Sequence, residues 1–173
     1  MRKLLWVLMV TLITTNLSAP IIPQHWVERA NLLFLRSMKE KSFYQADFSV
    51  QSFYEAIQFV GIQNPEIVLR QSVLETGWFK SSSFKDYNNP FGMKEPAYRK
   101  TLCKGTALGH GSFDHWFDAV KDYKMWQEYW LDTIYEPNQY YHFLDTLSYA
   151  EAKHYVKTLK LIDLSDLLDI PTS

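Results

Sequence analysis

The segment from Asn64 to Gly77 limits the folds open to this chain more than any other part of the sequence. Asn64 is a residue type that often precedes a helix, and Pro65 suits the first helical position. Gly77 suits the position just past a helix end, where the backbone often turns left-handed. The sequence therefore predicts a helix between these two residues, with Asn64 as its N-cap.

This predicted helix carries apolar residues on two sides. At about 100° per residue, Leu69 and Val73 point one way, while Ile67 and Leu74 point nearly the opposite way. A helix that is apolar on both sides is expected at the centre of a fold. The remaining direction is shared by Val68, Ser72 and Glu75, with Gln71 close by.

The rest of the chain predicts more helices and one small β element. Helical spacing of apolar residues predicts helices over residues 25–41, 48–60 and 151–164, and one that begins at Asp114 or Asp118 and ends near residue 135. Residues 97–113 are β-prone and contain Gly105, Gly109 and Gly111, which predicts a short hairpin. We therefore expect a mainly α (α+β) domain over residues 25–166, followed by a C-terminal tail, 167–173.

The N-terminus has the order of a secretory signal. Arg2 and Lys3 precede an apolar run over residues 4–13, and small and polar residues follow to Ala19. The run is shorter than the ~20 residues of a membrane span. We expect a signal peptide over residues 1–19 and export to the periplasm or the extracellular space. An uncleaved N-terminal anchor is the alternative.

Composition argues against several classes of function. The net charge is −1, so the chain has no overall positive field that would attract nucleic acid or an anionic membrane surface. The five histidines are scattered and no set of residues has metal-ligand spacing, so we expect neither a metal nor a cofactor. Cys103 is the single cysteine, which excludes an internal disulfide. We expect a monomer.

Glu75 is the candidate for chemistry. It ends the buried helix and is followed closely by Trp78 and Phe79. Burial and the negative end of a helix both favour the protonated form of a carboxyl, as a general acid requires. The alternative is a solvated surface residue, as is usual for a glutamate in the last turn of a helix.

Two motifs around Glu75 carry a resemblance. Residues 74–78 read Leu-Glu-Thr-Gly-Trp, and residues 88–94 read Asn-Asn-Pro-Phe-Gly-Met-Lys. The chain resembles the bacterial glucosaminidases, the family that includes the flagellar muramidase-type rod protein and many autolysins. Pro90 stands where that family usually has Leu. Looser matches occur at residues 111–123 and 149–157, so the resemblance covers about residues 26–164.

The resemblance implies a lysozyme-like helical domain with a small β-hairpin lobe beside the cleft. It implies hydrolysis of β-1,4 bonds between N-acetylglucosamine and N-acetylmuramic acid in peptidoglycan strands. The family's general acid corresponds to Glu75, and a tyrosine of its catalytic centre corresponds to Tyr149, which could instead be a packing residue. The residues that we expect to bind substrate are Trp78, Asn88, Asn89, Phe91, Tyr98, Trp116 and Tyr123. For Asn88 and Asn89 a role in holding the loop, and for Phe91 a role in the core, are open alternatives.

The chain departs from the family at one position. Many members carry a second acidic residue in the hairpin, but residues 97–112 contain no Asp or Glu. Glu95 and Asp114 are the nearest candidates for a second carboxylate. Alternatively, the 2-acetamido group of the substrate attacks, oriented by Tyr149 or Tyr98. A lytic transglycosylase and a catalytically inactive peptidoglycan-binding module are the competing functions.

Overall fold

The computed structural model describes residues 22–133, 135–147, 154–165 and 167–168. The expected signal peptide, Tyr149 and the last five residues of the expected tail lie outside these ranges. The chain divides into two compact units, Met1–Glu40 and Lys41–Ser173. Within the described ranges, no helix is both long enough and apolar enough to cross a membrane.

Helix α2 (Gln24–Gln45) begins in the first unit, which confirms the helix predicted over residues 25–41. Three apolar residues on which that prediction rested, Trp26, Leu33 and Phe34, are more than half exposed. The buried residue of α2 is Phe43, which belongs to the second unit.

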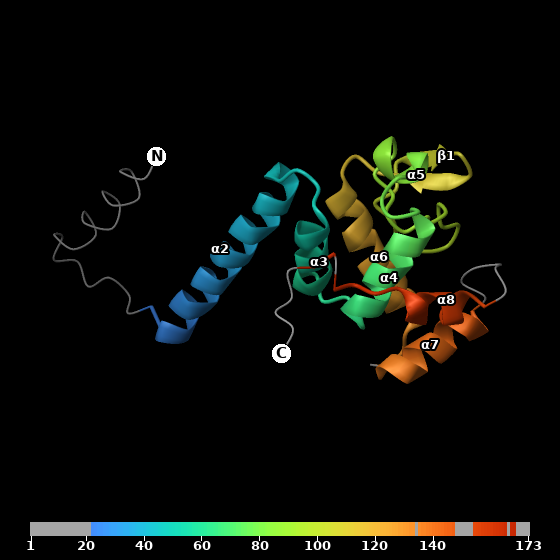
Figure 1. Ribbon diagram of the computed structural model, residues 1–173. Coiled ribbons are helices and arrows are strands. Elements are labelled where there is room, and N and C mark those ends of the chain that lie inside the picture. The colour runs from blue at the N-terminus through green and yellow to red at the C-terminus, as the bar shows by residue number, and fades with distance from the viewer. Residues whose placement is uncertain (1–21, 134, 148–153, 166, 169–173) are drawn as a thin grey trace, which may run out of the picture. The chain divides into compact units, whose positions relative to one another are not determined.

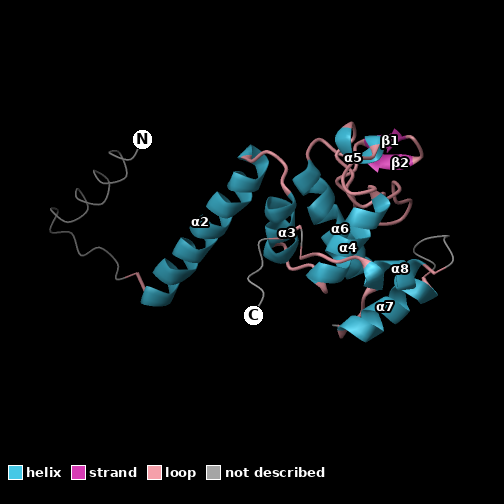
Figure 2. Ribbon diagram, in the orientation of Figure 1, coloured by secondary structure: helices cyan, strands magenta, loops and turns pink. Residues whose placement is uncertain are grey.

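Over its described residues, the second unit is mainly helical, with one two-stranded sheet (Figures 1 and 2). This confirms the predicted class and the lysozyme-like arrangement that the resemblance implies. The elements in chain order are α3 (Val50–Phe59), α4 (Pro65–Glu75), α5 (Ser82–Lys85), β1 (Gly105–Ala107), β2 (His110–Ser112), α6 (Trp116–Trp130), α7 (Pro137–Thr146) and α8 (Tyr155–Leu161).

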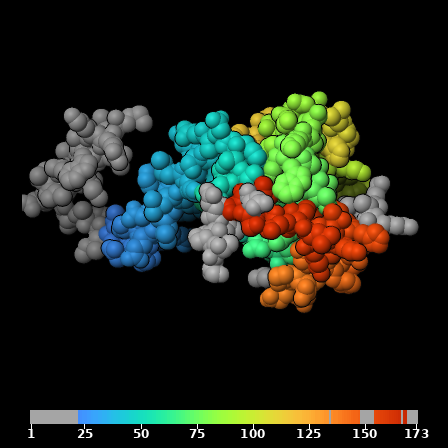
Figure 3. All heavy atoms as spheres, viewed as in Figure 1, coloured from blue at the N-terminus to red at the C-terminus, as the bar shows by residue number. Residues whose placement is uncertain are grey.

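Helix α4 is the central helix that the sequence predicts. Its buried residues cover most of its circumference: Ile67, Val68, Leu69, Gln71, Ser72 and Val73. Helices α3 and α8 pack against it, and α7 packs against α8 (Figure 3). Asn64 is the N-cap of α4, as predicted, but its side chain makes no capping hydrogen bond. Asn64 adopts a left-handed conformation, and its side-chain amide donates to the carbonyl of Tyr135 at 2.9 Å.

The start of α6 also differs from the prediction. Neither Asp114 nor Asp118 caps this helix. The N-cap is His115, whose Nδ1 accepts a hydrogen bond from the backbone N–H of Phe117 at 3.1 Å. Burial lowers the pKa of His115, which favours the neutral ring that this acceptor role needs.

Aromatic side chains form much of the core of the second unit. Phe53 is fully buried and contacts the rings of Phe91 and Trp116, with centroid distances of 5.5 and 6.2 Å. Phe43 and Phe117 pack at 4.9 Å beside them. The high aromatic content therefore serves the core to a large extent.

The predicted hairpin is present but short. Strands β1 and β2 are antiparallel, with Thr106 opposite Gly111. Leu108 and Gly109 form the two-residue turn, and both have positive φ, at 53° and 79°. Two central residues of positive φ match the right-handed twist of a tight hairpin.

Candidate active site

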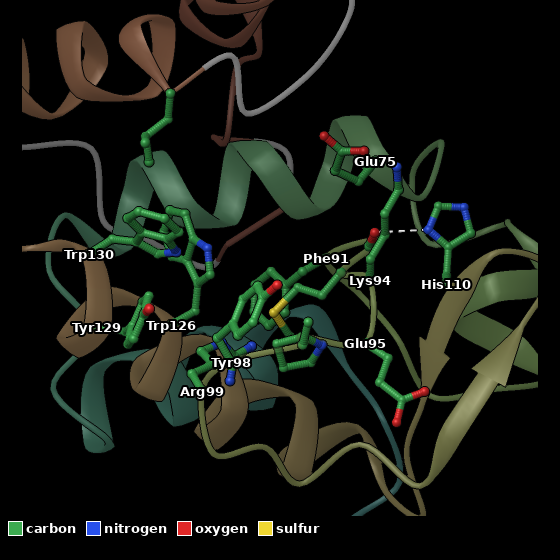
Figure 4. A pocket seen from close by; sticks show the side chains of 15 residues that line it. Glu75, Phe91, Lys94, Glu95, Tyr98, Arg99, His110, Trp126, Tyr129 and Trp130 are labelled. Carbon is green, nitrogen blue, oxygen red and sulfur yellow. Dashed lines mark hydrogen bonds between the residues drawn. The ribbon is translucent and has the colours of Figure 1, made fainter.

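A cavity of about 700 Å³ lies beside the end of α4. Glu75 and His110 line one end of it, while Trp126, Tyr129 and Trp130 of α6 line the other (Figure 4). The segment from Phe91 to Arg99 forms the wall between them. A carboxyl thus lies at the edge of a hollow large enough for sugar rings.

Glu75 owes its position to the way in which α4 ends. The backbone N–H of Trp78 donates to the carbonyl of Val73 at 2.8 Å, which closes the last turn of the helix. Gly77, Trp78 and Phe79 then adopt positive φ in succession, at 54°, 62° and 58°. This left-handed stretch turns the chain sharply just after the carboxyl, so Glu75 remains the final residue of the helix.

The surroundings of Glu75 favour its protonated form. Burial raises the pKa of Glu75 above its ordinary value, and it outweighs two opposing effects. The Tyr155 hydroxyl donates to Oε1 of Glu75 at 2.9 Å, and this bond lowers the pKa. The nearby charge of His110 lowers it further. The net result is a carboxyl that keeps its proton to a higher pH than a free glutamate.

Asn89 holds the loop that faces Glu75. Its side chain is fully buried, and its Nδ2 donates to the carbonyls of Met93 and Gly111 at 2.8 and 2.7 Å. Its Oδ1 accepts from the backbone N–H groups of Phe91 and Met93. Asn88 similarly donates to the carbonyl of Phe113 at 3.0 Å. Both amides are used within the protein, so they fix the loop and the hairpin to each other.

Gly92 and His110 bring this loop up to the acid. The Nδ1–H of His110 donates to the carbonyl of Gly92 at 2.8 Å. Gly92 has φ of 61°, and a methyl group at its Cα would lie 3.3 Å from Oε2 of Glu75. The left-handed backbone therefore favours glycine here, and a larger residue would crowd the acid.

A buried ion pair fixes the opposite end of the wall. The guanidinium of Arg99 donates to both carboxylate oxygens of Asp122 in α6, at 3.1 and 2.6 Å. Asp122 also accepts from the Thr101 hydroxyl and from the backbone N–H of Leu102, at 2.7 and 2.8 Å. These bonds fasten residues 99–102 to α6.

The aromatic end of the cavity is open to solvent. Trp130 is 49% exposed and Tyr129 is 52% exposed, and both come from the last turns of α6. Tyr98, in the wall, is the most exposed large side chain nearby at 93%. Exposed aromatic faces beside a cavity provide stacking surfaces for sugar rings.

The structure brings some of the expected site residues together and separates others. Glu75, Glu95, Phe91 and Tyr98 line the cavity. The residues that do not line it are Trp78, Asn88, Asn89, Asp114, Trp116 and Tyr123. Trp116 and Tyr123 are buried in the core, whereas Trp78 is half exposed elsewhere on the surface.

The two expected second carboxylates make other contacts. Glu95 accepts from the Thr106 hydroxyl at 2.8 Å, and its side chain points away from Glu75 (Figure 4). Asp114 pairs with Lys104 at 3.1 Å, and both side chains are exposed. Tyr149 lies outside the described residues, and its role stays a prediction.

Several residues of the site are not predicted from the sequence. Tyr155 and His110 approach Glu75, and Trp126 and Trp130 line the far end of the cavity. Trp126 and Trp130 are four residues apart and so share one side of a helix, but spacing alone does not say whether that side faces the core or a cleft.

Comparison with known proteins gives one match. The model of the glucosaminidase family, described as mannosyl-glycoprotein endo-beta-N-acetylglucosaminidase, matches residues 50–164. This range contains Glu75, the loop that faces it and the whole wall of the cavity. No curated protein and no solved structure gives a significant match. Within the described residues, no group of three or more His, Cys, Asp or Glu side chains could hold a metal ion. The chain belongs to the glucosaminidase family, and it is a glycoside hydrolase of the endo-β-N-acetylglucosaminidase type.

Proposed function

We propose that this protein hydrolyses the β-1,4 bond between N-acetylglucosamine and N-acetylmuramic acid in peptidoglycan, with Glu75 as general acid. The observation that carries the proposal is the position of Glu75, partly buried at the edge of a cavity whose far end is aromatic. Glycoside cleavage needs a carboxyl that donates a proton to the leaving oxygen. Burial that raises the pKa of Glu75 suits it to that role near neutral pH.

The cavity also suggests how the strand binds. A sugar that stacks on Trp126, Tyr129 or Trp130 would lie along the wall formed by residues 91–99, with its neighbour at Glu75. Because Glu95 is bonded to Thr106, we assign the attack on the anomeric carbon to the acetamido group of the substrate rather than to a second carboxylate. Water then opens the resulting ring intermediate and restores the acetamido group.

Digestion of purified peptidoglycan tests the proposal. The wild-type protein should release fragments that end in reducing N-acetylglucosamine, and Glu75→Gln should lose about 10²–10⁴-fold in rate. Glu66→Gln is the matched control, because Glu66 lies on the same helix but is exposed and pairs with Arg70 at 3.5 Å. It should leave the rate unchanged.

Mass analysis of the products separates the competing functions. Fragments with a 1,6-anhydromuramic end would identify a lytic transglycosylase. Binding of peptidoglycan without release of any fragment would identify an inactive binding module.

We also propose that the protein is exported, on the basis of the charged, apolar and small-residue order of residues 1–19. The mass of the mature protein recovered from expressing bacteria tests this. A mature N-terminus near residue 20 in the periplasm or medium supports cleavage, whereas full-length protein in the cytoplasm would contradict export.

A further inference from the structure

A continuous run of buried hydrogen bonds leads through the core of the second unit to Glu75. Its members are almost completely buried, with exposures of 7% for Tyr155 and of 1% or less for the others. They lie on α4, α6, α7 and α8, so the run joins the helices that surround the acid. In order toward Glu75, they are Gln127, Tyr140, Tyr123, Gln71 and Tyr155.

The orientation of the Gln127 amide is fixed at the far end of the run. Its Oε1 accepts from the backbone N–H of Gln63 at 2.8 Å, and its Nε2 donates to the backbone carbonyl of Gln63 at 3.0 Å. The reverse orientation would place oxygen against oxygen and N–H against N–H. Nε2 of Gln127 is thus also the donor to the Tyr140 hydroxyl, at 2.8 Å.

The direction of each following bond can then be assigned. The Tyr123 hydroxyl lies 2.8 Å from Oε1 of Gln71, which can only accept, so Tyr123 donates there. The Tyr140 hydroxyl, 3.0 Å from that of Tyr123, must therefore donate to it. Burial raises the pKa of Tyr140 to about 12, so this hydroxyl keeps its proton throughout the working pH range.

The last two links reach the acid. Nε2 of Gln71 donates to the Tyr155 hydroxyl at 3.4 Å, the longest bond of the run, and Tyr155 donates to Oε1 of Glu75 at 2.9 Å. Every donor in the run thus points toward Glu75. Hydrogen bonds aligned in one direction polarise each other, so each strengthens the next.

We propose that this run, the tyrosine–glutamine relay, is a positioning device that occupies Oε1 of Glu75 and keeps the transferable proton on Oε2. The proposal rests on the function proposed above. Oε2 is the oxygen that faces Gly92 in the cavity wall. A methyl group added to the Cα of Gly92 would lie only 3.3 Å from this oxygen. During cleavage the Oε2–H bond breaks, the proton passes to the glycosidic oxygen, and the bond from that oxygen to the anomeric carbon breaks. The new carboxylate keeps the hydrogen bond from Tyr155, which stabilises its charge.

The pH dependence of activity distinguishes this role from a purely structural one. Among the described residues, the groups that act on the Glu75 carboxyl are Tyr155 of α8 and His110 of β2. Lys94, Glu95 and Arg99, from the wall, line the same cavity. Because a bond donated to the charged form lowers a carboxyl pKa, loss of that bond raises it. Activity should then persist to higher pH in a relay variant.

The experiment compares variants that each remove one hydroxyl from the full-length protein. In Tyr155→Phe the alkaline limb of the pH–rate profile should move to higher pH. Its kcat should fall by about 10- to 100-fold, with KM changed less than about twofold, because the acid is displaced rather than the substrate. Tyr140→Phe should shift the limb in the same direction by a smaller amount, although a fully buried residue cannot touch substrate.

Tyr54→Phe is the matched control. Tyr54 is half-buried and bonds to Gln58, outside the relay. Its variant should keep the wild-type profile. If Tyr155→Phe and Tyr140→Phe lower the melting temperature but keep the wild-type pH–rate profile, the relay only supports the fold and the proposal is overturned.

A second measurement does not need activity. Titration of the Glu75 carboxyl by ¹³C NMR should show a higher pKa in Tyr155→Phe and Tyr140→Phe than in wild type, and no change in Tyr54→Phe. Equal pKa values in all four proteins would refute the relay. Failure of wild type to digest peptidoglycan would refute the proposed function instead, so the two failures are distinguishable.

Discussion

Arg99 and Asp122 form a two-pronged ion pair at 3.1 and 2.6 Å, and the two side chains are only 6% and 1% exposed. Their contact ties one end of the cavity wall to α6. Removal of one member of a buried pair leaves an uncompensated charge in the core.

We therefore expect Asp122→Asn to lower the free energy of unfolding by about 3–5 kcal/mol. Asp114→Asn makes the same change in the exposed pair with Lys104 and should cost at most about 1 kcal/mol. Urea unfolding of both variants measures the difference. Similar, small losses in the two would contradict the importance of the buried pair.

The ionisation of Glu75 should appear in stability as well as in rate. Burial raises the pKa of this carboxyl above 4.5, so wild type loses stability relative to Glu75→Gln as pH rises through the folded-state pKa. The melting temperature of Glu75→Gln minus that of wild type should therefore be larger at pH 8 than at pH 4. Calorimetry at the two pH values checks this, and a pH-independent difference would show that Glu75 is not perturbed.

Gly92→Ala should harm activity more than its backbone strain explains. The position has φ of 61°, and the added methyl group would press on Oε2 of Glu75 at 3.3 Å. Gly61→Ala carries similar strain, with φ of 76°, but meets nothing within 4 Å. Each variant should lose about 1–2 kcal/mol of stability. Only Gly92→Ala should also lower kcat, and equal rates in the two folded variants would count against crowding of the acid.

The aromatic end of the cavity predicts a binding defect. Trp130→Ala should raise KM by about 3- to 10-fold, equivalent to about 0.5–1.5 kcal/mol of stacking. Trp78→Ala removes an equally exposed tryptophan, 51% against 49%, that does not line the cavity. It should leave KM unchanged in digests of soluble glycan strands. The opposite result would favour the stacking role that the sequence suggests for Trp78.

Neither candidate for a second carboxylate should be essential. Glu95→Gln and Asp114→Asn should each keep at least about a third of the wild-type rate, because Glu95 bonds to Thr106 and Asp114 pairs with Lys104. Comparative digestion rates measure this. A loss as large as that of general-acid removal, about 10²-fold or more, would restore a second carboxylate to the mechanism.

The sequence predicts the fold well where spacing reflects burial. The two-sided apolar pattern of residues 65–76 predicts a central helix, and α4 is that helix. Helix α7 is not predicted, because its buried residues, Tyr140 and Leu144, are too few to give a clear repeat over ten residues. Cap residues are harder still. Asn64 takes the N-cap position of α4 as predicted, but its side chain bonds to the Tyr135 carbonyl instead of the helix, because a tertiary contact overrides local preference. His115 caps α6 in place of the expected aspartates.

The candidate site is only partly predictable. The position of Glu75 follows from helix period and motif, but its partner Tyr155 lies 80 residues away, and local spacing carries no information on such a contact. Trp116 and Trp130 are chemically equivalent in the sequence. One is 4% exposed in the core and the other is 49% exposed at the cavity, because they lie at opposite ends of α6 and face different neighbours.

The acid and the wall opposite it come from parts of the molecule held in different ways. Glu75 ends a helix that is buried over most of its surface, whereas Gly92 and its neighbours are fastened to the hairpin by a few hydrogen bonds, from Asn89, His110 and Thr106. Loops held by few bonds open at lower cost than packed helices. On warming, the loop that faces Glu75 should therefore open before the helices unfold. The temperature at which catalysis fails should then lie below the temperature of global unfolding.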